Sequence, residues 1–228
     1  ITGTSRGIGR GISEYFAQKD YLVEGCSRND SEISLKNYQH TNVDVSDEKQ
    51  VRLWIREVSK RHKIIDALVC NAGNVKASTM VSVTSTKSFD EYVKTQMMGT
   101  FMTCREVSKI MCRQKQGRII NISSAAVPLS LVGTGAYAGT KGGINSFTKV
   151  LANELSPYNI TCNVVAPGLV LTEATKKFGE DWKNNLLDKL TIKKVTTTDD
   201  VANVISFFIK PESNCITGQT IYMSLISP

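Results

Sequence analysis

The 228-residue chain has few of the features that mark a metal centre, a membrane protein or a disordered protein. It contains two histidines, and none of its six cysteines forms a Cys-x-x-Cys pair, so we expect no metal site. No apolar run approaches the roughly 18 residues of a transmembrane helix, and no linker, repeat or low-complexity tract divides the sequence. We therefore predict one domain over residues 1–228 that is cytoplasmic, binds no membrane and keeps cysteines such as Cys70 as buried free thiols.

The charges are unbalanced, with 28 Lys and Arg against 21 Asp and Glu, which gives a formal net charge of +7. Such an excess favours an anionic partner, for example a phosphate-bearing cofactor, an acidic protein or a nucleic acid, although a solvated basic surface accounts for it equally well. The basic residues are scattered, with no Arg-rich run and no aromatic RNA motif. A nucleic-acid partner is therefore not expected.

Short apolar runs alternate with longer segments in which apolar residues recur every three or four positions, as at Val51, Trp54, Ile55 and Val58. Because strand, helix and strand in this order need crossover connections, the sequence predicts an α/β fold whose parallel sheet is covered on both faces. The expected strands are residues 21–26, 64–70, 118–123, 160–165 and 220–223, and the expected helices are 9–18, 48–61, 89–114 and 136–155, with a further helix starting near 196–200.

Three glycines, Gly3, Gly7 and Gly9, lie directly before and within the start of the first expected helix. Residues without a Cβ allow a tight turn and let a pyrophosphate approach the N–H groups at a helix N-terminus. An ordinary turn would use the same residue type. The position of the loop at the start of the alternating pattern favours a dinucleotide site.

The end of the next strand favours a phosphorylated dinucleotide. A carboxylate there would accept hydrogen bonds from the ribose hydroxyls of NAD, but the strand ends in Cys26, Ser27 and Arg28. Arg28, together with Arg6 in the glycine loop, can form bidentate charge-assisted bonds to a 2′-phosphate. We therefore predict NADP(H) in preference to NAD(H); the alternative is that both arginines are only solvated.

Tyr137 and Lys141 lie four residues apart in an expected helix and so share one face. A phenol has a pKa of about 10, and a nearby ammonium group lowers this pKa by stabilising the phenolate, which makes tyrosine usable as an acid or base. Such pairs are common on protein surfaces. Here Ser124 ends a strand-like run 13 residues earlier, and its hydroxyl could polarise a substrate carbonyl together with Tyr137.

These motifs occur in the order typical of the short-chain dehydrogenase/reductase family, which the sequence resembles over nearly its whole length. The resemblance implies a single-domain Rossmann-like fold, a doubly wound parallel sheet with helices on both faces, and is closest to the 3-oxoacyl-[acyl-carrier-protein] reductases. The motifs that carry it are Thr2-Gly3-x-x-x-Gly7-Ile8-Gly9, Asp44-Val45, Asn71-Ala72-Gly73, Ser124, Tyr137 with Lys141, and Pro167-Gly168 followed by Thr172.

The resemblance implies roles for four catalytic residues. Tyr137 would donate the proton in reduction, and Ser124 would orient the carbonyl. Lys141 would hold the nicotinamide ribose and lower the pKa of Tyr137. Gln96 aligns with the fourth catalytic residue of the family, an asparagine that holds a water molecule in a proton relay to the lysine; the extra methylene of glutamine would alter that relay.

The resemblance also assigns the cofactor contacts. Asp44 and Val45 would contact the adenine, Asn71 would lie near the ribose, and Val170 and Thr172 would hold the carboxamide edge of the nicotinamide. The complete set expected to bind NADP(H) is Gly3, Ser5, Arg6, Gly7, Ile8, Gly9, Ser27, Arg28, Asp44, Val45, Asn71, Ala72, Gly73, Tyr137, Lys141, Pro167, Gly168, Val170 and Thr172.

The sequence departs from the family pattern at three further places. Cys70 replaces the first of two asparagines that usually precede the Ala-Gly pair. The usual Asp-Gly-Gly after the last strand is absent, since the chain reads Tyr222-Met223-Ser224 there. The first strand is expected to be largely missing, with Ile1 and Thr2 as its remnant.

The substrate is expected to be a ketone, either a small molecule or an acyl group on a carrier protein. Residues 173–195 are predicted to form a lid over it, an ordinary amphipathic helix being the alternative. The apolar run after Ser124 favours an acyl ketone over a charged sugar. Of two basic positions that the carrier-linked reductases use for docking, Lys115 keeps its charge and Tyr158 does not.

Other functions stay open at this point. The chain could reduce another small ketone or oxidise an alcohol, or it could be a catalytically weak dinucleotide-binding sensor or scaffold, which the change at Gln96 alone favours. The family resemblance further implies a homotetramer or dimer built through the helices at 89–114 and 136–155.

Overall fold

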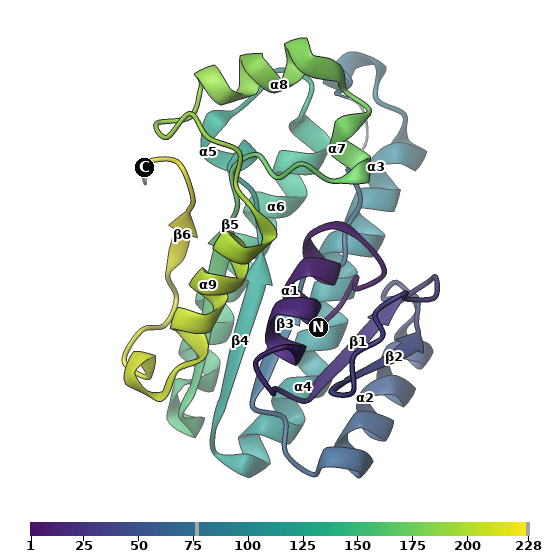
Figure 1. Cartoon of the computed structure of the whole chain (residues 1–228), viewed down its shortest axis with the longest axis vertical. Helices are drawn as coiled ribbons and strands as arrows, with labels where there is room; N and C mark the ends of the chain where they lie inside the picture. The colour runs from purple at the N-terminus through teal and green to yellow at the C-terminus, as the bar shows by residue number, and fades with distance from the viewer. Residues whose placement is uncertain (76–77, 227–228) are drawn as a thin grey trace.

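The computed structural model describes residues 1–75 and 78–226, and Figure 1 shows them as a parallel sheet with helices on both faces. This arrangement confirms the predicted doubly wound α/β fold. Every strand pairing is parallel, as crossover connections require. One set of paired strands is β1 (Val23–Ser27) and β2 (Tyr38–Asn42), and the other, in spatial order, is β3 (Ala67–Cys70), β4 (Gly117–Ile122), β5 (Ile160–Ala166) and β6 (Thr220–Tyr222).

The first two residues lie between these two sets of strands. The Thr2 N–H donates to the Val69 carbonyl (3.0 Å), and the Cys26 N–H donates to the Ile1 carbonyl (3.1 Å). Thr2 also forms an isolated parallel bridge with Cys26. Ile1 and Thr2 therefore lead directly from the middle of the strands into the glycine loop.

Buried apolar side chains form two clusters, one on each face of the sheet. Helices α2 (Glu48–His62), α4 (Gly99–Gln114) and α6 (Gly135–Leu155) supply one cluster, and α1 (Gly7–Ala17) with α9 (Thr198–Ile209) supplies the other (Figure 1). Fully burying a Val, Leu or Ile side chain contributes roughly 1.5–3 kcal/mol, so both layers are held mainly by this burial. The shorter helices lie near the carboxyl ends of the strands: α3 (Thr86–Tyr92), α5 (Ala126–Leu129), α7 (Glu173–Lys176) and α8 (Gly179–Asp188).

Two helix starts are set by their own side chains. Asp47 accepts hydrogen bonds from the N–H groups of Lys49 (2.9 Å) and Gln50 (3.1 Å) at the start of α2. Thr197 and Asp200 form a reciprocal capping box at the start of α9, as the Thr-Thr-Asp-Asp sequence predicts. Each cap contributes about 1 kcal/mol to the free energy of unfolding.

Hydrophobic periodicity predicted neither one of the strands nor an irregular stretch within one helix. The polar segment 38–42 carries no strand signal, yet it forms β2, because pairing with β1 rather than its own composition stabilises it. The helix expected over 89–114 has three parts: α3 ends at Tyr92, a π-helix covers Val93–Met98, and α4 begins at Gly99. A π-helix widens the turn and redirects the side chains it carries, and such segments are frequent at functional sites.

The cysteines are free, and they fall into different environments. Those that are buried match the expectation from the sequence, whereas Cys112 is half-buried and Cys215 is exposed. The buried thiols are Cys26, Cys70, Cys104 and Cys162.

Across the described part of the chain, no helix has the length and apolar character needed to cross a bilayer.

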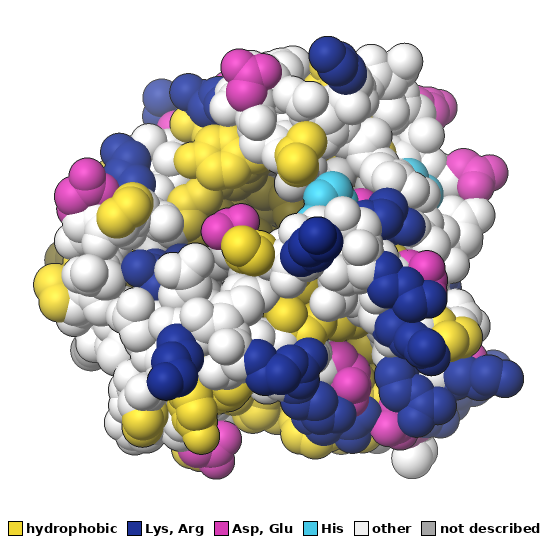
Figure 2. All heavy atoms as spheres, turned by 90° about the horizontal axis from the view of Figure 1, so that it is seen from below, with side chains coloured by type: hydrophobic (Ala, Val, Ile, Leu, Met, Phe, Trp, Pro, Cys, Tyr) yellow, Lys and Arg dark blue, Asp and Glu magenta, His cyan; other side chains and the backbone are white. Residues whose placement is uncertain are grey.

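Basic side chains gather over part of one face of the molecule, and acidic side chains lie among them. Figure 2, which views the molecule from below, shows Lys and Arg side chains with Asp and Glu side chains between them. Arg61 pairs with Glu24 (2.8 Å), and Arg105 pairs with Glu48 (2.7 Å). Because exposed pairs of this kind contribute only about 0–1 kcal/mol, they neutralise charge without holding the fold together.

Candidate active site

The glycine loop is shaped by close backbone approach. Gly3 (φ +75°) and Gly7 (φ +57°) occupy the left-handed region, which favours glycine. A Cβ on Gly3 would lie 2.8 Å from the Ala72 Cα, and one on Gly9 would overlap the Gly3 carbonyl oxygen. Gly9 thus lets the loop fold onto helix α1. At the start of α1, Arg6 makes no capping bond through its side chain, so the first N–H groups of the helix stay available to an anion.

Asn71, at the end of β3, holds this loop in place. Its Nδ2 donates to the carbonyls of Thr2 (3.0 Å) and Gly3 (3.2 Å), and its backbone N–H donates to Thr2 Oγ1 (3.0 Å). Asn71 lines the cofactor cavity, as predicted. Its amide nitrogen, however, is used to position the loop, so the contribution of this side chain is partly structural.

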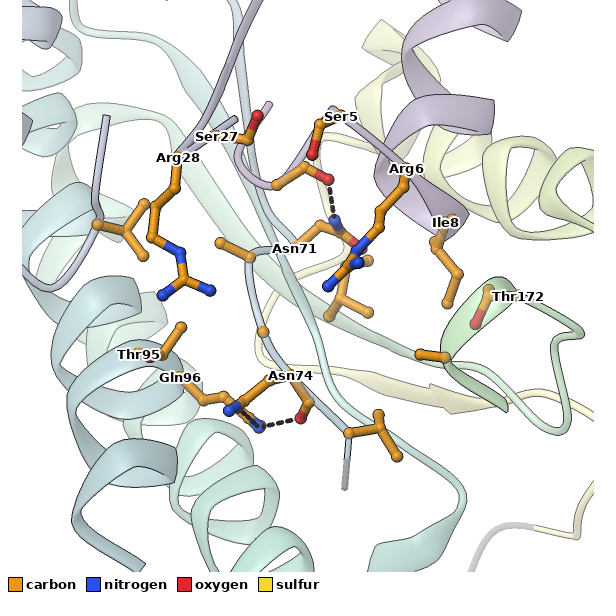
Figure 3. A pocket seen from close by; sticks show the side chains of 18 of the residues that line it. Ser5, Arg6, Ile8, Ser27, Arg28, Asn71, Asn74, Thr95, Gln96 and Thr172 are labelled. Atoms are coloured by element: carbon orange, nitrogen blue, oxygen red, sulfur yellow. Dashed lines mark hydrogen bonds between the residues drawn. The ribbon is translucent and has the colours of Figure 1, made fainter. Parts of the chain in front are cut away.

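Arg6 and Arg28 lie on opposite sides of the same cavity, and Figure 3 shows both guanidinium groups pointing into it. Neither forms an ion pair within residues 1–75 and 78–226, whereas Arg10, Arg61 and others are paired with glutamates. A guanidinium group without an acidic partner is free to bind a phosphate bidentately.

His40, to which the sequence analysis assigned no role in the site, positions the turn around Arg28. His40 Nε2 lies 3.0 Å from the Asn29 carbonyl, and Ser27 Oγ donates to that same carbonyl (2.7 Å). Tyr38 Oη lies 2.8 Å from His40 Nδ1. Because the Asn29 carbonyl can only accept, Nε2 is the donor to it and Nδ1 is left to accept. Tyr38 Oη donates to Thr4 Oγ1 (2.8 Å), and that hydroxyl lies 3.3 Å from Nδ1 and can donate to it. No sequence motif marks His40, because Thr4, Ser27 and Asn29 lie far from it in the chain.

The cofactor cavity, about 230 Å³ in volume, brings together most of the predicted cofactor residues. Pro167, Gly168 and Val170 instead line a second, neighbouring cavity, and Gly9 lines neither of the two. The predicted residues that do line the cofactor cavity are Gly3, Ser5, Arg6, Gly7, Ile8, Ser27, Arg28, Asp44, Val45, Asn71, Ala72, Gly73, Tyr137, Lys141 and Thr172. The lining residues that the sequence analysis missed are Asn29, Val43, Asn74, Val75, Thr95, Ile122, Ser123, Glu173 and Ala174.

Asp44 and Gln96 have their own bonds within this cavity. Asp44 Oδ1 accepts from Ser46 N–H (2.9 Å) and Oγ (2.7 Å), which orients its carboxylate. Gln96, on the π-helix, is fully buried, and its Nε2 donates to the Asn74 carbonyl (2.8 Å; Figure 3). Among residues 1–75 and 78–226, Gln96 Oε1 has no hydrogen-bond partner. A buried carbonyl oxygen without a partner costs about 1–3 kcal/mol, so this atom is suited to accept from a bound group or a water molecule.

Tyr137, Lys141 and Ser124 converge where helix α6 passes the end of β4. Lys141 is buried, its Nζ donates to the Ile122 carbonyl (2.8 Å), and it lies 6.0 Å from the centre of the Tyr137 ring. Burial lowers the pKa of Lys141 to about 8. The constellation predicted from the sequence is therefore assembled in space.

The pKa of Tyr137 differs from the prediction. Burial raises this pKa above its ordinary value, and a hydrogen bond with Ser124 offsets only part of the rise. Lys141 does not contribute to this shift. Tyr137 is only half-buried, but the protein packed around its ring still penalises the phenolate. In the ligand-free protein Tyr137 thus holds its proton at neutral pH.

A second cavity of about 340 Å³ adjoins the first at Tyr137, which lines both. Ser124 lines this second cavity together with apolar residues such as Leu129, Leu131 and Trp182. Among the described residues that line it, none is Asp, Glu, Lys, Arg or His. We call the first the cofactor cavity and the second the substrate cavity.

The cofactor cavity fits a phosphorylated dinucleotide. The glycine loop leaves a cradle that a Cβ would fill, and the start of α1 offers N–H groups to a pyrophosphate. Arg6 and Arg28 supply unpaired guanidinium groups of the kind a 2′-phosphate requires. Across the described chain, no group of three or more His, Cys, Asp or Glu side chains is placed to hold a metal ion.

Comparison with known proteins agrees with this geometry. A family model described as enoyl-(acyl carrier protein) reductase matches residues 3–224. The 3-oxoacyl-[acyl-carrier-protein] reductase FabG of Staphylococcus epidermidis is 31% identical over 98% of this chain and 96% of its own length. FabG of Escherichia coli K12 is 27% identical over 98% of this chain and 94% of its own.

Solved structures show the same likeness. The structure described as ElxO with NADP bound superposes with a TM-score of 0.91 at 30% identity, covering 98% of this chain and 95% of that one. A Tyr-to-Phe variant of ElxO with NADPH bound gives a TM-score of 0.90 at 30% identity, covering 97% of this chain and 94% of that one. The chain belongs to the short-chain dehydrogenase/reductase family and is an oxidoreductase, as its motifs predict.

Proposed function

We propose that the protein reduces the ketone of an acyl chain, such as a 3-oxoacyl thioester on a carrier, to a secondary alcohol with NADPH. The observation that carries this proposal is the meeting of two unlike cavities at Tyr137. The first is lined by charged residues of both signs, with Arg6, Arg28 and Lys141 among them, and the second by apolar and hydroxyl side chains with no charged residue among those described. An anionic cofactor matches the first, and an uncharged ketone matches the second. The names of the FabG relatives and of the NADP-bound ElxO structures support the same reading.

NADPH, when bound, supplies the hydride that the carbonyl carbon accepts. Tyr137 then donates its proton to the carbonyl oxygen, which its raised pKa allows because the phenol is protonated at neutral pH. Ser124, hydrogen-bonded with Tyr137, donates to the same oxygen and stabilises the charge that develops on it.

Lys141 acts on the phenolate that remains after proton transfer. Its ammonium group lies 6.0 Å from the Tyr137 ring centre, in a buried site where its charge favours the phenolate. With its pKa lowered to about 8, Lys141 also gives up a proton more easily than an ordinary lysine, which helps to reprotonate Tyr137.

The carrier protein is the less supported part of this proposal. Lys115, the one basic docking position that the sequence keeps, is the C-cap of α4 and precedes the first residue of β4. Ser124 follows the other end of β4, about 20 Å away along a six-residue strand. A carrier docked at Lys115 would therefore lie at the opposite end of the sheet from the reacting ketone of the same chain, so a thioester without its carrier is an equally suitable substrate.

The test is a spectrophotometric assay of NADPH oxidation with acetoacetyl-carrier protein, acetoacetyl N-acetylcysteamine and small neutral diketones. We expect reduction of the thioesters, and we expect Tyr137→Phe to lower kcat/KM by about 10²–10⁴-fold while the Kd for NADPH stays nearly constant.

Two results would contradict the proposal. The first is a Tyr137→Phe variant that keeps most of the activity. The second is reduction of crotonyl thioesters, which contain a carbon–carbon double bond, in preference to the 3-oxoacyl ones. If NADPH binds tightly but no ketone is reduced, the protein is a dinucleotide-binding sensor instead.

A further inference from the structure

His40 lies at the centre of a polar cluster beside the turn that follows β1. Its Nε2 lies 3.0 Å from the Asn29 carbonyl oxygen and 3.2 Å from Ser27 Oγ. Its Nδ1 lies 2.8 Å from Tyr38 Oη and 3.3 Å from Thr4 Oγ1. The imidazole therefore connects β2 with the turn and with the glycine loop, and both of its ring nitrogens face oxygen atoms.

A glycine makes room for this cluster. His40 lies opposite Gly25 in the pairing of β2 with β1. A Cβ on Gly25 would overlap Tyr38 Oη and would lie 2.7 Å from Thr4 Oγ1. The space that this glycine leaves is therefore filled by the hydroxyl groups that surround the imidazole.

The ring nitrogens of His40 can be satisfied in both charge states. In the neutral ring, Nε2 donates to the Asn29 carbonyl and Nδ1 can accept from Thr4 Oγ1. After protonation Nδ1 becomes a donor, and the Tyr38 oxygen at 2.8 Å can accept from it while the Tyr38 O–H donates to Thr4 Oγ1 (2.8 Å). Protonation thus keeps the hydrogen bond to Asn29, and with it the position of the turn.

The turn that His40 holds faces the cofactor cavity. Ser27, Arg28 and Asn29 all line this cavity, and Figure 3 shows the Arg28 guanidinium group pointing into it. Within the described chain no carboxylate lies at ion-pair distance from the His40 ring, whereas His62 Nε2 lies 2.7 Å from a glutamate oxygen. The charge of His40 is therefore not fixed by an acidic partner of the protein itself.

Few charged or titratable groups surround the imidazole. The Tyr38 phenol contacts it from the same strand, and Arg28 and Asp30 belong to the adjoining turn. The Asp30 carboxylate accepts from Asn42 Nδ2 (2.7 Å). In the glycine loop, Arg6 points into the cofactor cavity (Figure 3). A 2′-phosphate held by Arg28 carries a charge of about −1.5 to −2 and would be the strongest negative charge beside His40.

We propose that His40 is a further specificity-determining residue for NADP(H), because its imidazole takes up a proton from solvent when the 2′-phosphate binds and releases it when the cofactor leaves. Imidazole is the side chain whose ordinary titration falls between pH 5 and 8. A ligand that prefers the protonated form binds best below this range and loses that part of its affinity as the pH rises through it. NAD(H) lacks the 2′-phosphate and should show no such dependence. The inference rests on the placement of the 2′-phosphate at Arg28 and not on the identity of the ketone.

The experiment measures the Kd values of NADP⁺ and NAD⁺ by isothermal titration calorimetry from pH 6 to 8.5. The ratio of the two constants removes the contribution of groups that both cofactors meet, such as Lys141, whose pKa of about 8 lies in the same range. We expect the preference of the wild type for NADP⁺ to fall by about fivefold to tenfold across this range. NADP⁺ titrations near pH 7 in buffers of different ionisation enthalpy should show uptake of about 0.3–0.5 proton.

Two variants assign this dependence to its source. The phosphate itself has a second pKa of about 6, so its affinity weakens at the acid end whatever His40 does. His40→Gln isolates that effect, since glutamine can still donate to the Asn29 carbonyl but is not protonated; its preference for NADP⁺ should not fall with rising pH, and its proton uptake should vanish. His62→Gln is the matched control, because His62 is the only other histidine and lies at the end of α2. It should keep the wild-type profile.

The outcomes are distinct from those that test the proposed function. Equal pH profiles in the wild type and His40→Gln would overturn the inference, since a purely structural role lowers the affinity by the same factor at every pH. A profile that flattens in His62→Gln would overturn it as well. If NADP⁺ binds no more tightly than NAD⁺ at any pH, the placement of the 2′-phosphate is wrong and the inference fails with it. Because binding needs no turnover, a protein that reduces no ketone contradicts the proposed function while the pH profiles still decide this inference.

Discussion

The two cavities that meet at Tyr137 differ in their chemistry and in how they are built. The cofactor cavity is lined by charged groups, including Arg6, Arg28 and Lys141, and its walls are largely the ends of strands and the start of α1. The substrate cavity has no charged residue among those described and is covered by α8, which is anchored at its ends. One fold thus presents a charged site beside a largely apolar site that a separate helix covers.

The difference between the two cavities indicates which residues determine selectivity for the cofactor and which determine selectivity for the substrate. On the cofactor side, Asn71 and His40 hold the phosphate-facing turns through hydrogen bonds between strands, so the positions of charges are set by the sheet. In the substrate cavity, the shape and the apolar area of the walls determine which ketone fits. Part of these walls comes from α8, a segment outside the sheet. Substitutions in the first cavity should therefore change cofactor affinity and proton transfer, and substitutions in the second should change which ketone reacts.

The largest effect is expected from Lys141→Met, because this buried residue lines the cofactor cavity beside Tyr137, where the two cavities join. We expect kcat/KM to fall by at least about 10²-fold. Burial lowers the folded-state pKa of Lys141 to about 8, whereas an unfolded lysine titrates near 10.4. Between these values the unfolded chain binds more protons, so wild-type stability should rise with pH across this window, by on the order of 3 kcal/mol. The variant should lack that rise.

Urea unfolding of the ligand-free protein at several pH values from 7.5 to about 10.5 measures this difference. Lys149→Met, which removes an exposed lysine from the same helix, is the control and should keep the wild-type slope. An equal slope in wild type and Lys141→Met would show that Lys141 is not held in a destabilising charged state.

A smaller and more selective effect is expected from Arg28→Gln. Removing one bidentate partner should raise the KM for NADPH by about 10–100-fold and leave the KM for NADH nearly unchanged, because NADH carries no 2′-phosphate. Initial-rate kinetics with both cofactors measures it, with Arg56→Gln on the exposed face of α2 as the control. Parallel loss with both cofactors would place Arg28 elsewhere than at the 2′-phosphate.

The smallest effect is expected from His40→Ala, which releases the turn at residues 27–29 without removing a cofactor contact. We expect the KM for NADPH to rise by about threefold to tenfold, with kcat and the KM for NADH nearly constant. His40→Gln, which can still donate to the Asn29 carbonyl, should restore part of the loss. A change in kcat alone would mean that His40 stabilises the fold without positioning Arg28.

The local motifs of the site were readable from the sequence because their function depends on short spacings. Gly3, Gly7 and Gly9 share one turn, and Tyr137 and Lys141 share one helix face, so the chain itself keeps these residues together. Strand β2 and the π-helix that carries Gln96 were not predictable, because pairing with β1 and packing against neighbouring elements form them.

The protonation of the site also depends on the tertiary structure. The sequence predicted that Lys141 lowers the pKa of Tyr137, but burial raises it, and burial depends on every element packed around α6. The position of Lys115 also depends on the tertiary structure. Its charge alone is compatible with an acidic partner, but β4 separates Lys115 from Ser124, so the two residues lie at opposite ends of the sheet.

By itself the sequence determined the α/β order and the family, and it singled out the candidate site residues, since these follow from hydrophobic periodicity and from motifs a few residues long. The tertiary structure decided which cavity each residue faces, that His40 holds the turn at Arg28, and that the half-buried side chains of Phe178, Trp182 and Leu186 at α8 line a cavity. Those outcomes arise from contacts between residues far apart in the chain, which no local pattern records.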